Sequence, residues 1–213
     1  MSKYFNEADC QTLEDILRLR RDVRGNRFSD RALSDDTVKR LIDAALHAPS
    51  VGFSQPWQFV VIRKDSVKQQ VYQSFLKANE IAQKQFDGDK QSRYRQLKLE
   101  GILQAPVNLA IFYKPEHSPV LGQNSMLDMG RFSVVCAIQN LWLMARAMNI
   151  GVGWVSIVDP QQVKSAVNAD ADAELIGYLC IGYVSEFLDS PELAQKGWAD
   201  KKPIEEVVFF DRF

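Results

Sequence analysis

The sequence has little of what several common classes of protein need. It contains two histidines in 213 residues, which excludes a zinc or iron site built from several histidines. Its three cysteines, Cys10, Cys136 and Cys180, lie far apart and form no Cys-x-x-Cys pair. We therefore expect neither a disulfide framework nor a cysteine metal site. No segment approaches the roughly 18 consecutive apolar residues that a membrane-spanning helix needs.

The chain also lacks an excess of charge and a targeting segment. It has 26 Lys and Arg against 27 Asp and Glu, so bulk charge gives no support to nucleic-acid binding. The first ten residues carry three charges and no apolar run, and we expect no signal peptide. Cys136 and Cys180 lie in apolar runs and are predicted to be buried thiols. A reducing, cytoplasmic location fits this cysteine usage.

Apolar residues make up 46 % of the chain, which is ample for a folded core. No repeat, low-complexity tract or flexible linker divides it, so residues 1–213 are predicted to form one domain. The hydrophobic pattern predicts an α+β fold with a central sheet and several helices. We expect strands at 59–62, 107–113, 154–158 and 176–184. We expect helices at 12–21, 34–49, 128–149 and 160–167, and two more within 66–100, joined near 87–89.

The long helix predicted at 128–149 has no charged residue between Arg131 and Arg146. A helix that is apolar nearly all round is buried on all sides. A chain of this length cannot easily bury it alone, so we expect a homodimer with this helix in its interface. Gly151 is the expected residue that ends the helix. The segment 187–213 shows few regular signals and is expected to wrap over a partner.

Three segments carry candidate binding chemistry, and the first is Arg20-Arg21-Asp22-Val23-Arg24. Three arginines in five residues offer planar donors that suit a phosphate group. The alternative is a solvated, basic helix end. Asp22 lies among these positive charges, which favour its ionised form unless burial opposes them.

The second segment is the loop Ala48–Trp57, with Ser50 and Gly52 as candidate ligand contacts; the alternative is an ordinary connection between a helix and a strand. The third is Gly151-Val-Gly-Trp-Val-Ser156. Gly153 permits close approach of something flat or bulky, and Ser156 is a polar residue in a predicted strand, where the alternative is a serine bonded to backbone. Neither a dinucleotide fingerprint nor a P-loop is present. His47 is expected at a helix end rather than as a base.

Taken together, these segments resemble the nitroreductase-like flavoprotein superfamily. The resemblance rests on RRDVRGNRF at 20–28, HAPSVGFSQPW at 47–57, GVGWVSI at 151–157 and PELAQKGW at 191–198. It implies a mixed or antiparallel sheet surrounded by helices, and an intertwined homodimer that binds FMN between its subunits.

Within this superfamily the motifs are most similar to the branch that fragments reduced FMN with O2. That branch forms 5,6-dimethylbenzimidazole, the lower ligand of vitamin B12, together with erythrose 4-phosphate. The resemblance implies a separate NAD(P)H flavin reductase as the source of reduced FMN, and no metal. Two alternatives stay open: an NAD(P)H-dependent FMN nitroreductase or flavin reductase, and a non-catalytic flavin-binding protein.

The resemblance also implies roles for individual residues. Asp22 would remove a proton near the first ribityl carbon, and Ser156 would lie at the flavin ring. Residues 66–100 would form a lid, and Lys201 and Lys202 are candidates for a phosphate contact from the tail. Arg20 and Arg24 would hold the FMN phosphate, with Arg21 as a further donor. The expected flavin contacts are Arg20, Arg21, Asp22, Val23, Arg24, Ser50, Gly52, Gly153 and Ser156.

Overall fold

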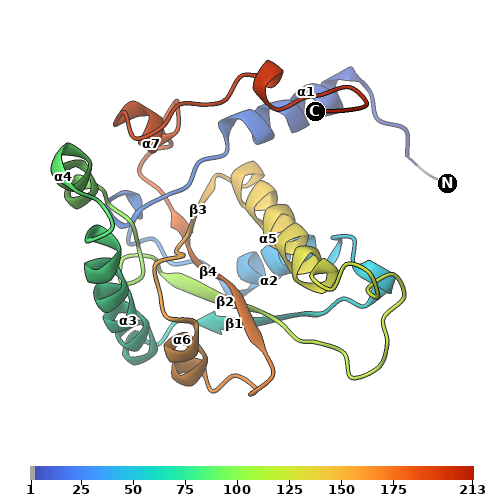
Figure 1. Cartoon of the computed structure of the whole chain (residues 1–213), viewed down its shortest axis with the longest axis horizontal. Coiled ribbons are helices and arrows are strands. Elements are labelled where there is room, and N and C mark those ends of the chain that lie inside the picture. Colours follow the sequence, from blue (N-terminus) through green and yellow to red (C-terminus); the bar gives the residue numbers. More distant parts are fainter. Residues whose placement is uncertain (1–2) are drawn as a thin grey trace.

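The computed structural model describes residues 3–213, which form a four-stranded antiparallel sheet with helices on both faces (Figure 1). The order of the strands is β1-β2-β4-β3. Their bounds are β1 Trp57–Ile62, β2 Val107–Tyr113, β3 Ile150–Trp154 and β4 Glu174–Tyr183. The α-helices are α1 Glu7–Leu19, α2 Asp35–Leu46, α3 Asp65–Gln83, α4 Gly88–Gln96, α5 Met129–Ala147, α6 Pro160–Val167 and α7 Glu192–Gln195.

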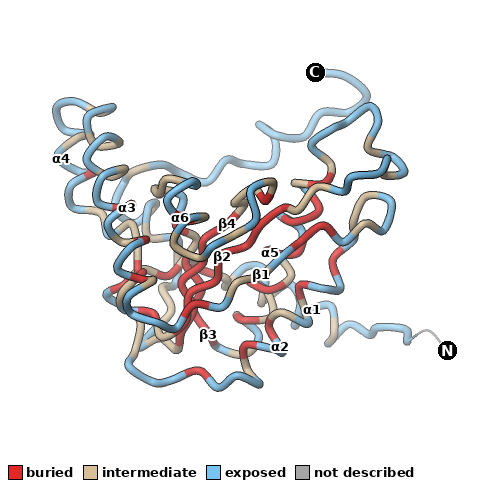
Figure 2. Tube along the Cα trace, turned by 90° about the horizontal axis from the view of Figure 1, so that it is seen from below, coloured by how far each residue is buried: buried red, intermediate tan, exposed pale blue. Residues whose placement is uncertain are grey.

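The sheet is the middle layer, and its central strand β2 shows why. Leu109 and Ile111 face a cluster made with α2 and α5, whereas Ala110 and Phe112 face a second cluster made with α3 and α6. Successive strand residues point to opposite faces, so a strand covered on both sides is a continuous apolar run. All seven residues of β2 are buried, as the central trace in Figure 2 shows. The predicted strand at 107–113 is therefore confirmed.

The helices also follow the predicted order, with shifted ends. Ser34 accepts a hydrogen bond from the Thr37 N–H and begins α2 as expected. The 66–100 region does contain two helices, α3 and α4, separated before Gly88. The first helix begins at Glu7 and not at 12, because Asn6 and Asp9 form a reciprocal capping box.

The strand predicted at 154–158 is wrong in position. β3 spans Ile150–Trp154, so Gly151 and Gly153 are strand residues and Ser156 lies beyond the strand. Asn149, with φ of 54°, takes the left-handed conformation after α5 that was expected of Gly151.

Burial of α5 on all sides is not found within the single chain. Phe132 is 49 % exposed and Val135 is 40 % exposed. Cys136 lies on the same exposed side, which corrects its predicted burial, whereas Cys180 is buried as predicted. The helix therefore presents an apolar face that this chain does not cover.

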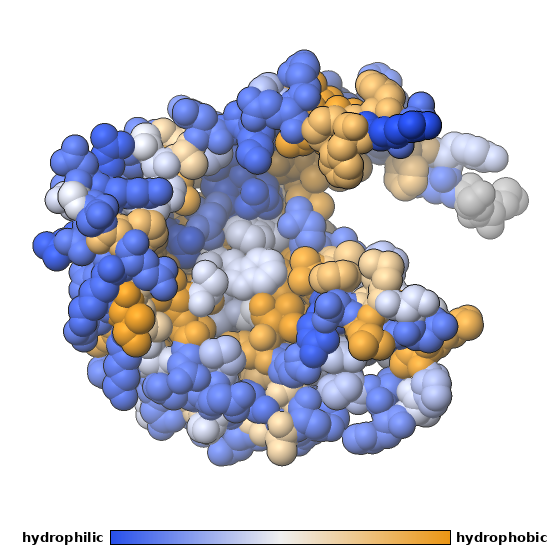
Figure 3. All heavy atoms as spheres, in the orientation of Figure 1, coloured by the Kyte–Doolittle hydropathy of each residue, from blue (hydrophilic) through white to orange (hydrophobic). Residues whose placement is uncertain are grey.

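Two terminal segments add to this uncovered apolar surface. Helix α1 has no buried residue, and every residue of 201–213 is exposed. Figure 3 shows a broad hollow in this face of the molecule, with hydrophobic residues along its edges. No helix within the described range is long and apolar enough to cross a membrane. The exposed apolar residues of 3–19 and 201–213 are Tyr4, Phe5, Leu13, Leu17, Ile204, Val207, Val208, Phe209, Phe210 and Phe213.

Candidate active site

A cavity of about 160 Å³ lies where three parts of the chain meet. One wall is the segment that follows α1, the second is the strap 97–99 after α4, and the third is the start of α7. The lining residues are Arg20, Arg21, Asp22, Arg24, Leu97, Lys98, Leu99, Pro191, Glu192 and Leu193.

The first wall is held in place by β3. The Val23 N–H donates to the Val152 carbonyl at 3.0 Å, and Asp22 forms a parallel bridge with Val152. Val23 is only 2 % exposed, so this extended segment packs as an addition to the sheet. Gly153 is required at this point, because a Cβ there would overlap the Val23 carbonyl oxygen. The close approach predicted for Gly153 is therefore made by the protein's own backbone.

Asp22 is a partly buried acid in the cavity. Its Oδ1 accepts a hydrogen bond from the Trp154 N–H at 3.0 Å, and its Oδ2 pairs with Arg24. Burial raises the pKa of Asp22, and this exceeds the lowering by Arg24, the Trp154 N–H and Arg20. A carboxylate in this position is a stronger base than an exposed one, which suits proton removal.

Arg24 joins the walls of the cavity. Besides its pairing with Asp22, its Nη1 donates to the Leu99 carbonyl at 3.1 Å and to the Trp154 carbonyl at 3.3 Å. The Gly25 N–H also donates to the Glu100 carbonyl at 2.8 Å. The strap after α4 is therefore fastened directly to the segment that carries Asp22.

Arg20 differs from Arg21 and Arg24 because its guanidinium makes neither an ion pair nor a hydrogen bond within the described residues. Its Cζ lies 4.6 Å from the centre of a Trp142 ring, and burial lowers the pKa of Arg20. A partly buried cation without a carboxylate partner is costly unless an anion joins it. Arg20 is the residue best placed to receive one.

The guanidinium of Arg21 donates hydrogen bonds to backbone carbonyls. Its Nη1 donates to the carbonyls of Arg18 and Arg20, and its Nη2 donates to the carbonyl of Asp189 in the tail. Only its Nε, which is buried and has no partner in the described part of the chain, is left for a ligand. Its role as a further phosphate donor stays a prediction limited to that atom.

The loop with Ser50 and Gly52 lies elsewhere in the chain. The Val51 N–H donates to Ser133 Oγ at 3.1 Å, whereas Trp142 Nε1 donates to the Arg21 carbonyl at 3.2 Å. Ser133 and Trp142 are nine residues apart on α5, which is roughly 13 Å along the helix axis. One chain therefore does not bring this loop to the cavity.

The remaining predicted residues also lie outside the cavity lining. Ser156 is exposed, two residues after β3, and its hydroxyl makes no hydrogen bond to any residue of 3–213. It is therefore not the backbone-bonded serine of the alternative interpretation. Lys201 and Lys202 are exposed in the tail. His47 ends α2, where its Nδ1 lies 2.8 Å from the Asp43 carbonyl, as expected of a helix-end histidine.

Sequence reasoning placed the strap within the lid expected at 66–100, but it missed the start of α7 as a cavity wall. The signal was the motif PELAQKGW at 191–198, which was assigned only to a tail expected to wrap over a partner. Pro191, Glu192 and Leu193 from this motif line the cavity. Its last residue, Trp198, packs on Phe86 and Tyr94 near α4, with ring centres at 5.2 and 6.2 Å.

Within residues 3–213 no group of three or more His, Cys, Asp and Glu is arranged to hold a metal ion. The cavity instead joins four cationic side chains to two carboxylates, Asp22 and Glu192. This balance favours an anionic ligand, and Asp22 supplies a base beside it.

Comparison with known proteins shows the family to which this chain belongs. Residues 17–183 match the Nitroreductase family. The chain is 40 % identical over 201 residues to a 5,6-dimethylbenzimidazole synthase of Rhodospirillum rubrum, covering 93 % of this chain and 94 % of that one. An iodotyrosine deiodinase bound to FMN and 3-iodo-L-tyrosine superimposes with a TM-score of 0.72 at 20 % identity, covering 94 % of this chain and 99 % of that one. A BluB-like flavoprotein from Clostridium difficile superimposes with a TM-score of 0.70 at 23 % identity, with the same coverage. The chain belongs to the nitroreductase family and, within it, to the group of the 5,6-dimethylbenzimidazole synthases.

Proposed function

We propose that this protein fragments reduced FMN with O2 to 5,6-dimethylbenzimidazole and erythrose 4-phosphate. The observation that carries the proposal is that one cavity, in a chain from this group, holds both a partly buried base, Asp22, and a guanidinium without an ion pair in the described residues, Arg20. A reaction that removes a proton from a phosphorylated ligand needs both.

The cavity residues fit the phosphate end of FMN. Arg20, Arg21, Arg24 and Lys98 against Asp22 and Glu192 give four positive and two negative side chains. The unpartnered Nε of Arg21 and the unpaired guanidinium of Arg20 are donors that a phosphate would satisfy. We propose that Arg20 makes the principal phosphate contact, with Arg24 and Arg21 Nε beside it.

When bound, reduced FMN supplies the oxygen-reactive ring system that is broken down. Asp22 takes a proton near the first ribityl carbon, and its raised pKa makes it an effective base. The Val23 N–H bonds the Asp22 segment to β3, and the absence of a side chain on Gly153 of β3 lets the segment approach this closely. The unbonded hydroxyl of Ser156 is free to contact the flavin ring. No metal takes part in the proposed chemistry.

We propose that the protein works as an intertwined homodimer, with residues 1–213 of each copy forming one domain. Members of this family are typically dimers. The uncovered faces of α5 and α1 and the exposed tail give a second copy an apolar surface to bury. A second copy also brings another Ser50–Gly52 loop, which completes the flavin site that one chain leaves open. Light scattering at micromolar concentration tests this, and a monomeric mass would contradict it.

The region 66–100 is proposed as the lid. Helices α3 and α4 lead into the strap that forms one cavity wall, so their closure excludes water from the site. We propose that reduced FMN comes from a separate NAD(P)H flavin reductase, and that the protein works in the cytoplasm, where its three cysteines stay reduced.

The deciding experiment supplies chemically reduced FMN and air, and measures 5,6-dimethylbenzimidazole by mass spectrometry. The expected result is benzimidazole formed together with loss of flavin, and neither without O2. A parallel reaction contains oxidised FMN, NADPH and air without a reductase. Rapid flavin reduction by NADPH with no benzimidazole in either reaction would favour a nitroreductase instead.

A further inference from the structure

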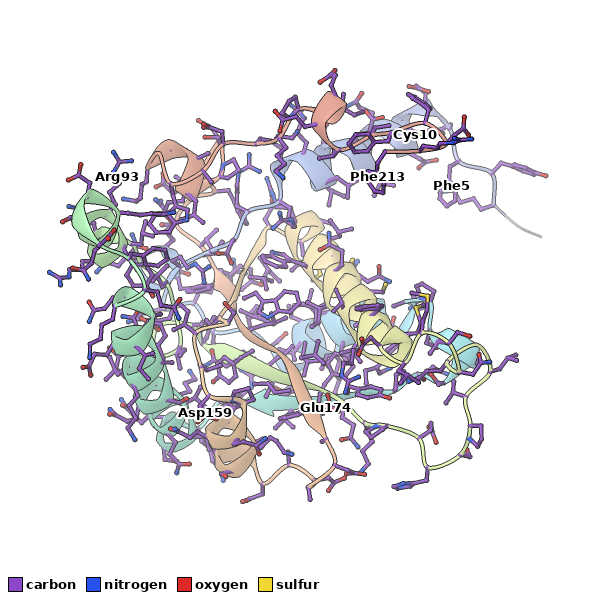
Figure 4. The ribbon with its side chains drawn as sticks, viewed as in Figure 1. Phe5, Cys10, Arg93, Asp159, Glu174 and Phe213 are labelled. Carbon is purple, nitrogen blue, oxygen red and sulfur yellow. The ribbon has the colours of Figure 1, made fainter. Side chains whose placement is uncertain are left out.

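The motif at 191–198 connects the cavity to the lid. Two residues before it, the Asp189 carbonyl accepts a hydrogen bond from Arg21 Nη2. At its end, Arg93 Nη1 of α4 donates to the Gly197 carbonyl at 3.1 Å, and Trp198 packs beside α4. Figure 4 shows Arg93 beside this segment, and Figure 1 shows α7 next to α4. The residues between these two anchors are therefore held against the cavity.

Glu192 is the charged residue that this segment presents to the cavity. It is partly buried, and Asp22 is the other carboxylate among the lining residues. Within residues 3–213 its carboxylate makes neither an ion pair nor a side-chain hydrogen bond. The cations that share the cavity are Arg20, Arg21, Arg24 and Lys98. Arg24 is paired with Asp22 and Arg21 with backbone, so neither neutralises Glu192.

Asp22 needs an exit for the proton that it accepts. Its Oδ1 faces the Trp154 N–H and its Oδ2 faces Arg24, and both of these groups are donors that cannot take a proton. The open direction is the cavity, whose volume of about 160 Å³ is enough for several water molecules. Glu192 is the acceptor on that route, because it is the other carboxylate that lines the cavity.

We propose that Glu192 relays the proton from Asp22 to bulk water; this inference rests on the proposed function. This step follows release of the phosphorylated product, when water enters the cavity. The O–H bond of the Asp22 carboxyl then breaks, and an O–H bond forms on the Glu192 carboxylate through that water. Glu192 then releases the proton to solvent. No electrons and no other groups move in this step, and Asp22 returns to its basic form.

The test compares Glu192→Gln with Glu192→Asp, and with Glu205→Gln as a matched change on an exposed tail residue. Benzimidazole is measured with excess enzyme, for a single turnover, and with excess reduced FMN, for many. Asp22 begins as a carboxylate, so a single turnover of Glu192→Gln should stay within about twofold of wild type. Repeated turnover should fall at least about tenfold, toward the range known for positioned proton transfer. Added imidazole, or the Asp variant, should restore it, and Glu205→Gln should match wild type.

Two results would overturn the relay. One is repeated turnover of Glu192→Gln at the wild-type rate. The other is a slow variant that neither imidazole nor the Asp substitution restores, because that pattern belongs to a structural role. If the wild-type protein itself makes no benzimidazole, the proposed function fails, and the relay fails with it.

Discussion

Gly153 and the Val23 carbonyl oxygen occupy neighbouring positions so close that no side chain fits between them. Gly153→Ala must therefore push the Asp22–Arg24 segment away from β3. Overpacking of this kind costs on the order of 1–3 kcal/mol. We expect a lower denaturation midpoint together with weaker flavin binding, measured by urea unfolding and by flavin fluorescence titration. Unchanged values for both would show that the segment is not held as described.

Asp22→Asn separates binding from chemistry. The amide keeps the size of the side chain but cannot take a proton at neutral pH, so benzimidazole formation should fall by about 10²–10⁴-fold. Flavin affinity should persist or improve, because a negative charge beside Arg20 and Arg24 is gone. Reduced flavin should then return as oxidised FMN with peroxide. Benzimidazole at the wild-type rate would remove Asp22 from the mechanism.

The pH dependence follows from the burial of Asp22. Its pKa is raised above the ordinary value of 3.8. As the pH is lowered, kcat/KM should therefore begin to fall at a higher pH than it would with an exposed aspartate as the base. Glu192 contributes to this raised pKa, and Glu192→Gln should move the acidic limb to lower pH. Glu205→Gln is the control and should leave the limb in place. An identical limb in wild type and Glu192→Gln would contradict the electrostatic contact.

Arg20→Ala tests the phosphate contact. Loss of one charge-assisted hydrogen bond should weaken FMN binding by about 1.5–3 kcal/mol, which is roughly 10- to 150-fold. Arg40→Ala on the exposed side of α2 is the control and should bind like wild type. Arg24→Ala should also weaken binding, but it releases Asp22 and the strap as well, so only Arg20→Ala isolates the ligand. Equal FMN affinity in Arg20→Ala and wild type would show that Arg20 does not contact the phosphate, and would favour the alternative of a solvated, basic helix end.

Trp198→Ala tests the attachment of the lid. Removal of the ring that packs on Phe86 and Tyr94 should loosen α4 from the tail. We expect faster proteolytic cleavage between α3 and α4, and more peroxide per benzimidazole formed, because water reaches the site. Trp198→Phe should retain most of the contact. A wild-type cleavage rate in Trp198→Ala would show that the lid does not depend on this contact.

Sequence patterns predicted the fold well where apolar residues follow one another without interruption. β2 and β4 are apolar runs, and the break between α3 and α4 coincides with polar residues and Gly88. They failed at β3, because Gly151 and Gly153 add no apolar side chain and have the composition of a turn. These glycines are strand residues whose missing side chains make room for Val184 and for the Asp22–Arg24 segment. Only the packed structure reveals that requirement.

The sequence predicted several of the side chains that form the site, but it did not predict which contacts they make. The sequence pointed to Asp22 and the arginines, yet it did not distinguish the free guanidinium of Arg20 from Arg21, which donates to three backbone carbonyls. That distinction depends on long-range contacts such as the one with Asp189. The wall formed by Glu192 was missed for the same reason, since more than 160 residues separate it from Asp22 in sequence.

The position of this wall in the sequence means that it is synthesised after the rest of the cavity. Asp22 emerges from the ribosome more than 160 residues before Pro191, Glu192 and Leu193 are made. The base and the arginines are therefore present long before the cavity can close around a ligand. A nascent chain can complete its sheet first, and the enclosed site forms only when the segment 189–198 docks on α4 and Arg21. An unfinished or prematurely terminated chain that ends before residue 189 thus presents the arginines without the enclosure that a reactive, reduced flavin requires.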